Sequence, residues 1–110
     1  ASQLVNDGWI EAEAYTQVDC FGAATLFARE EGIIPAPESS HAVKSAVAHA
    51  EAAKEEGVAK TILFNLSGHG HFDMSAYDAY FAGSLTDYEL SADDIDGNKA
   101  AFAAFPSPPA

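Results

Sequence analysis

The sequence has one cysteine, few basic residues and no long apolar run, and each of these absences excludes a class of protein. Cys20 alone cannot form an internal disulfide or a thiolate zinc cluster. Five Lys and Arg against 17 Asp and Glu give a net charge of −12. Nucleic acids and anionic membranes require clustered basic residues, so neither is an expected partner. No stretch has transmembrane length and no signal peptide is visible, so we expect a cytoplasmic protein.

The length and composition predict one small domain. A chain of 110 residues, 48% hydrophobic and 11% aromatic, can form a core of limited size. No repeat or linker divides it, so we expect a single, partial domain over 1–110, with 83–110 as an extended and short-helical tail. The chain opens without Met, as if in mid-sequence. It is either a fragment of a longer protein or a natural short one, and its oligomeric state is open.

Two long helices are predicted, with a rigid connector between them. The first, over 18–31, begins after a cap formed by Thr16 and Asp19 and ends at Gly32. The connector IIPAPESS has two prolines, which exclude a regular helix. The second helix follows it, capped by Ser39 or Ser40, and ends at Gly57.

A β-branched and aromatic run over 61–66 predicts a buried strand that leads into a glycine loop. A short helix over the MSAYDAYF run and a last one after Ser91 should follow. The alternation of strands and helices predicts an α/β fold, in which helices flank a small parallel sheet.

The loop SGHGHFD, 67–73, is the first candidate site, and three readings of it are open. Ser67 and the loop backbone could receive a polar ligand at the end of the strand. His69, His71 and Asp73 could instead bind a metal with His41 or His49 as a further ligand. The loop could also be a tight glycine turn with solvated histidines.

Glu38 is the second candidate, because the rigid connector fixes its direction just before a helix. A carboxylate held there could accept a proton or orient a ring hydroxyl of a ligand. It could equally be an acid that interacts with the helix dipole. Cys20 lies in an apolar helical pattern and is expected to pack rather than react.

Two motifs carry a family resemblance. EGIIPAPESSHAV (31–43), then a helix, then ILFNLSGHGHFD (62–73), resemble the C-terminal part of the tryptophan synthase β chain. The sequences SGHGHFD, AYDAY and LTDYEL are more similar to those of the second, tryptophan-synthase-β-like subfamily than to those of the common form. The resemblance implies a fragment of the parallel-sheet C-terminal domain of a fold type II pyridoxal-phosphate enzyme. The parent reaction is replacement of the serine hydroxyl by indole to give tryptophan.

The resemblance also implies roles for individual residues. Ser67 would hydrogen-bond the pyridine nitrogen of pyridoxal phosphate, and Glu38 would lie beside the phenolic side of its ring. Ser39 and Gly68 would be close neighbours. In the site loop, His69 stands where the common form has an arginine, and Asp73 is retained. A salt bridge between them would be weaker and pH-dependent.

The family's Schiff-base lysine, phosphate cup and catalytic glutamate have no counterpart in these 110 residues. We therefore expect no catalytic residue in this chain, no covalently bound cofactor and no activity of the chain alone. The expected partners are the remainder of the β chain and a second copy of the chain. The rival interpretations are a non-catalytic binding or scaffold module and, less favoured, a histidine-based metal-binding domain. The nucleophile and association with an α subunit stay open.

Overall fold

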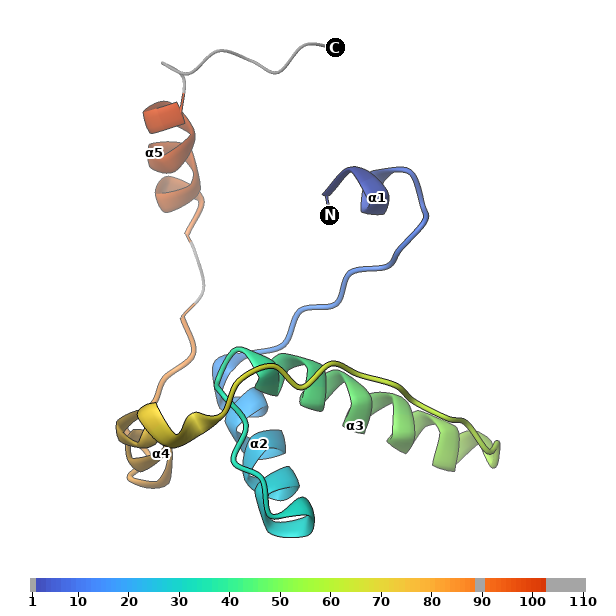
Figure 1. Cartoon of the computed structure of the whole chain (residues 1–110). Coiled ribbons are helices and arrows are strands. Elements are labelled where there is room, and N and C mark those ends of the chain that lie inside the picture. The colour runs from blue at the N-terminus through green and yellow to red at the C-terminus, as the bar shows by residue number, and fades with distance from the viewer. Residues whose placement is uncertain (1, 89–90, 103–110) are drawn as a thin grey trace.

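The computed structural model describes residues 2–88 and 91–102, which form helices joined by irregular segments (Figure 1). The elements are α1 (Ser2–Asn6), α2 (Gln17–Glu31), α3 (Ser39–Glu56), the 3₁₀ turn η1 (Gly70–Phe72), α4 (Met74–Phe81) and α5 (Ala92–Phe102). These described residues contain no strand, and their only β pairing is an antiparallel bridge between Pro35 and His69. The helices of the predicted α/β fold are therefore found, whereas its small parallel sheet is not.

The segment predicted as a strand, 61–66, runs alongside α3 without regular structure (Figure 1). Its side chains keep the two-residue alternation of a strand: Ile62 and Phe64 are half-buried, while Leu63 is 95% exposed. The Phe64 ring packs edge-on against Phe27, with 5.9 Å between ring centroids. The prediction of a buried strand is wrong here because alternation fixes side-chain direction, whereas burial of both faces requires neighbouring strands.

Helix α2 begins and ends as the sequence predicts. Thr16 Oγ accepts a hydrogen bond from the backbone N–H of Asp19 at 3.3 Å. Gly32 ends the helix at φ 70°, a left-handed conformation that glycine adopts without a steric penalty, and its N–H donates to Ala28. Helix α3 ends in the same way at Gly57. Both ends show that local capping chemistry sets the helix bounds.

The start of α3 differs from the prediction. Glu38, rather than Ser39 or Ser40, occupies the N-cap position, and its side chain makes no capping hydrogen bond. Both serines lie inside the first turn and are buried. Ser40 Oγ donates to the Ala36 carbonyl at 2.9 Å. The serines bond the connector and the glycine loop because both segments fold back over the start of the helix.

One cluster of the small core lies between α2 and α4. Phe21, Ala24 and Tyr77 are its buried members. Phe21 meets Tyr77 edge-on at 4.9 Å and stacks on Tyr80 at 5.7 Å, two geometries that aromatic pairs favour. This core fixes α4, and with it the loop that precedes α4, against α2.

Helices α1 and α5 lie away from α2, α3 and α4 (Figure 1). In the predicted tail, Ser91 Oγ accepts from the N–H of Asp94 at 3.1 Å, and the Asp94 carboxylate accepts from the N–H of Ser91 at 3.1 Å. This reciprocal cap confirms the predicted last helix. The rest of the tail, 103–110, lies outside the described residues. No helix in the described part is long and apolar enough to cross a membrane.

Candidate functional site

The connector before α3 and the glycine loop after 61–66 lie against each other. The N–H of Gly70 donates to the Ile34 carbonyl at 2.9 Å, and Pro35 pairs with His69 in the isolated bridge. The Tyr77 hydroxyl donates to the Pro35 carbonyl at 2.6 Å. These bonds join two segments that are more than 30 residues apart in the sequence, and they bring the two predicted site motifs together.

Ser39 and Ser67 form the direct contact between the motifs. Their Oγ atoms are 3.1 Å apart, and the Ser39 hydroxyl donates to the Ser67 carbonyl oxygen. A serine hydroxyl has one proton, so in the Oγ–Oγ contact Ser67 is the donor. Ser39 is 4% exposed, whereas Ser67 is exposed. The Ser67 hydroxyl can therefore turn its proton toward an external acceptor while Ser39 stays fixed.

Gly68 adds backbone that can approach a ligand closely. Its φ is +70°, a conformation that disfavours any side chain, and a Cβ there would lie 3.4 Å from the Cβ of Ala36. The structure thus brings Ser39, Ser67 and Gly68 together. The result is a polar, accessible surface at the start of α3.

Glu38 lies next to this surface in the sequence but makes no hydrogen bond with Ser39 or Ser67 in the described structure. Its side chain is exposed and borders a neighbouring hollow of about 210 Å³, together with Cys20 and His41. The structure therefore places Glu38 at the edge of the serine pair rather than within it.

Cys20 and His41 contact each other inside that hollow, with 3.4 Å between Sγ and Nδ1. Burial, followed by the nearby Asp19 carboxylate, raises the pKa of the Cys20 thiol. A raised pKa keeps the thiol protonated and weakly nucleophilic. Cys20 is 2% exposed, which agrees with the predicted packing role.

The site-loop histidines contact each other rather than Asp73. His69 Nδ1 accepts from the N–H of His71 at 3.3 Å, and the two rings are 4.6 Å apart. Asp73 starts α4, and its N–H donates to Gly70. No ion pair joins His69 to Asp73 in the described residues. Over the same residues, no three His, Cys, Asp or Glu side chains are grouped as a metal would require.

A second polar cluster, around Glu13, was missed by the sequence analysis. The Glu13 carboxylate accepts from Ser45 at 2.7 Å and from Tyr15 at 2.9 Å, and it pairs with His49 Nε2 at 3.0 Å. The Ser45 bond, more than any other contact, lowers the pKa of Glu13. Ser45 and His49 are one turn apart on α3, and that spacing was the available signal.

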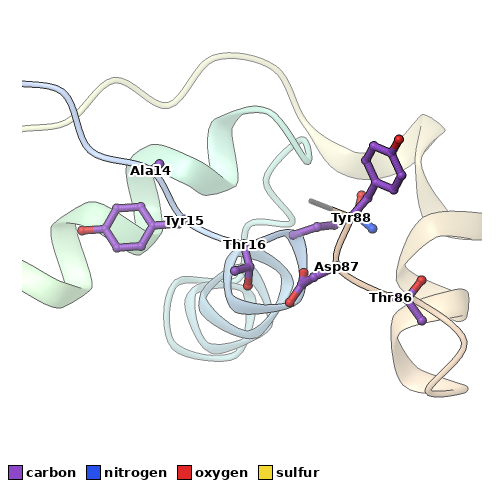
Figure 2. Close-up of a pocket in the computed structure, with 7 residues that line it drawn as sticks. Ala14, Tyr15, Thr16, Thr86, Asp87 and Tyr88 are labelled. Atoms are coloured by element: carbon purple, nitrogen blue, oxygen red, sulfur yellow. The ribbon is translucent and has the colours of Figure 1, made fainter. Parts of the chain in front are cut away.

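A hollow of about 360 Å³ lies at the start of α2, between residues 14–17 and residues 86–88 (Figure 2). Asp87 Oδ1 accepts from the N–H of Val18 at 2.9 Å, across 69 residues. Figure 2 shows the Asp87 carboxylate beside Thr16, with the Tyr88 ring turned away. Thr16 and Asp87 accept from two of the free N–H groups of the helix start, and the Asp87 carboxylate already supplies a negative charge there, so this hollow does not favour an anion.

Comparisons with known proteins agree with the motifs. No family model matches the chain. It is 62% identical over 84 residues to tryptophan synthase beta chain 2 of Methanosarcina acetivorans, which covers 76% of this chain and 19% of the relative. It is 60% identical over 85 residues to tryptophan synthase beta chain 2 of Aquifex aeolicus, and this match covers 77% of this chain and 20% of the relative. It is 54% identical over 88 residues to the tryptophan synthase beta chain of Thermococcus onnurineus, and this match covers 80% of this chain and 20% of the relative.

The chain therefore spans about one fifth of the length of the curated relatives it matches. The resemblance to the tryptophan synthase β chain that the two motifs predicted is confirmed.

Proposed function

We propose that this chain forms one wall of the pyridoxal-phosphate site of a tryptophan synthase β-type enzyme. The reaction of the whole enzyme would replace the hydroxyl of serine by indole. The observation that carries the proposal is the contact of Ser39 with Ser67, which joins the PAPES and LSGHG motifs at one accessible surface. The relatives named tryptophan synthase beta chain support it.

The residues present fit the pyridine edge of this cofactor. Ser67 offers an exposed hydroxyl whose proton can turn from Ser39 to a ring nitrogen, and Gly68 lets the backbone approach the ring. When bound, pyridoxal phosphate supplies an electron-withdrawing ring that stabilises negative charge on the amino-acid substrate. A neutral serine donor leaves the ring nitrogen unprotonated, and buried Ser39 holds the Ser67 backbone in place.

Glu38 would act at the phenolic side of the ring. It directly precedes Ser39, and its side chain is exposed beside the serine pair. A carboxylate at that position can hold a proton at the phenolic oxygen. His69 and Asp73 would belong to the loop that covers the site.

The surroundings of the four lysines in this chain support the proposal that the cofactor is attached covalently to a lysine elsewhere in the enzyme. Lys60 pairs with Glu56 at 3.0 Å, and Lys44 lies over the Tyr15 ring at 5.8 Å. Lys54 is in the last turn of α3, and Lys99 pairs with Asp96 on α5. We infer that the remainder of the β chain supplies the lysine and that this chain alone is inactive. Borohydride treatment of the chain with pyridoxal phosphate should leave no single modified lysine in its mass spectrum.

A chimera tests the proposed function. The matching segment of the M. acetivorans β chain is replaced by this chain, and tryptophan formation from serine and indole is measured. We expect activity, and we expect Ser67→Ala to lower kcat/KM by about tenfold or more and to shift the cofactor absorbance, because it removes a hydrogen bond to the ring. The control is Ser75→Ala, an exposed serine on α4.

The expected results separate the enzyme from a scaffold module. A chimera that folds and binds the cofactor with unchanged absorbance in Ser67→Ala contradicts the role of Ser67. A folded chimera without cofactor or activity favours a non-catalytic module with the same partial fold.

We further propose that the remainder of the β chain covers this chain in the enzyme, and that the isolated chain associates with itself in the cytoplasm. The accessible surface is 8534 Å². A compact protein of this mass exposes about 5,800 Å². The larger accessible surface of this chain supports the proposal that other protein surfaces cover the apolar side chains that the isolated chain leaves exposed.

A further inference from the structure

An apolar hollow of about 310 Å³ lies between α2 and α4. It is separate from the serine pair and plays no part in the function proposed above. Its lining comes from both helices and from the connector: Thr25, Ala28, Arg29, Met74, Tyr77 and Phe81, with Ile34. The volume is that of a site for a one- or two-ring ligand.

Two polar residues of α2, Thr25 and Arg29, belong to this lining. The Thr25 hydroxyl is buried and has no hydrogen-bond partner in the described part of the protein. Burying a hydroxyl without a partner destabilises a protein, so such a group points to a missing acceptor or donor. Tyr77, the other hydroxyl of the lining, already donates to the Pro35 carbonyl. Thr25 is therefore the lining residue whose hydroxyl still lacks a partner in the described structure.

Arg29 supplies the charge. It is the only arginine of a chain with net charge −12, it is exposed at the rim of the hollow, and no ion pair within the described residues engages it. Thr25 and Arg29 are one helical turn apart, so one group can reach both side chains. A guanidinium binds a carboxylate through two parallel hydrogen bonds.

We propose that this hollow binds a small aromatic carboxylate. The ring packs among Met74, Tyr77 and Phe81, and the carboxylate accepts from the Arg29 guanidinium and the Thr25 hydroxyl. The exposed apolar surface of Met74 and Phe81, 43% and 62% exposed, is then covered by the ligand ring. Charge complementarity at Arg29 selects an acid over a neutral or cationic ring.

Phenylacetate titrated into the 110-residue chain tests the proposal, with ¹H–¹⁵N NMR as the readout. We expect saturable shifts confined to α2 and α4, and weaker binding at high salt because the ion pair is exposed. Arg29→Gln should raise Kd by about tenfold or more, and Thr25→Val by about two- to tenfold. Lys54→Gln removes the same charge far from the hollow and should leave Kd unchanged. The neutral analogue phenylacetamide should bind at least about tenfold more weakly.

A variant that fills the hollow distinguishes loss of binding from loss of the fold. Ala28→Leu occupies the hollow from α2 and should abolish the shifts while the helical circular dichroism is kept. Shifts that do not saturate, that survive in Ala28→Leu, or that are equal in Arg29→Gln and Lys54→Gln overturn the proposal. A dimer seen by sedimentation that phenylacetate dissociates would show that a second copy covers this face, and it too would overturn the ligand assignment.

Discussion

Gly70 is the residue at which the connector and the loop come closest. A Cβ there would lie 2.7 Å from the Pro35 carbonyl oxygen, 2.8 Å from Ile34 Cγ2 and 3.0 Å from Tyr77 Cε2. The first of these is backbone and cannot rotate away. The contact between the two motifs therefore depends on the absence of a side chain at this one position.

We predict that Gly70→Ala destabilises the chain by about 1–3 kcal/mol, the usual effect of overpacking a tight site. Urea unfolding followed by far-UV circular dichroism measures the change. Gly97→Ala is the control, because a Cβ there meets nothing within 4 Å and alanine favours the interior of α5. Equal urea midpoints for Gly70→Ala and the unaltered chain would show that the loop does not need this close approach.

At the residue scale, the sequence pointed to the two contiguous motifs that the structure brings into contact. Ser39 and Ser67 meet because the connector and the glycine loop are bonded to each other, whereas their roles toward a cofactor stay a prediction. Two of the partners of Glu13, Ser45 and His49, lie more than 30 residues away on α3, so no local pattern joined them to it. For the same reason, the shared hollow of Glu38, Cys20 and His41, and the contact of His69 with His71 rather than Asp73, became visible only in three dimensions.

At the scale of elements, the N-terminal segment is held on α3 through one carboxylate. Glu13 faces Tyr15 on its own segment and Ser45 and His49 on α3, while Lys44 lies over the Tyr15 ring. The pKa of Glu13 is lowered from its ordinary value of 4.5, first by the Ser45 hydrogen bond. Ionised Glu13 therefore favours the docked segment.

We predict that this docking is lost in acid. The stabilisation is fully present above the ordinary carboxyl pKa and disappears as the pH falls through the lowered pKa of Glu13, because the free segment then binds the proton more tightly. NMR shifts of Tyr15 and Ser45 between pH 6 and about 3 measure it. Glu13→Gln should remove the transition, whereas the neighbouring Glu11→Gln should keep it. A transition that is the same in both variants would assign the pH dependence to another group.

The helices were predictable because their signals are local: apolar spacing, a cap at Thr16 or Ser91, and glycines at the ends. The sheet was not. The run over 61–66 has the alternation and β-branched residues of a strand, but a strand becomes part of a sheet only through neighbours. About four fifths of the length of the matched relatives lies outside this chain, and we expect the neighbouring strands there.

At the scale of the whole molecule, the chain is less compact than its length allows. Its radius of gyration is 17.5 Å, against about 13 Å for a globular domain of this size. Leu63, Phe72 and Trp9 are 95%, 91% and 79% exposed. Apolar side chains so exposed on an open shape favour association.

We predict concentration-dependent self-association, measured by sedimentation equilibrium. Leu63→Asp should weaken it by about tenfold, because a charge on the open edge of 61–66 opposes strand pairing and burial. Ser75→Asp adds the same charge on α4 and should have little effect. Phenylacetate should not change this association, because its proposed site lies between α2 and α4. A monomer at all concentrations would contradict the proposed self-association and weaken the case for an uncovered edge.

The open segment 61–66 also determines where the isolated chain is cut. Proteases bind their substrates in extended form and cleave most readily where backbone is exposed and unpaired. The stretch between α3 and the glycine loop already has that form, with Leu63 pointing outward and no backbone partner in the described structure. A protease specific for large apolar residues should therefore separate α2 and α3 from α4. The lifetime of this polypeptide in a cell then depends on how soon another protein surface covers six residues.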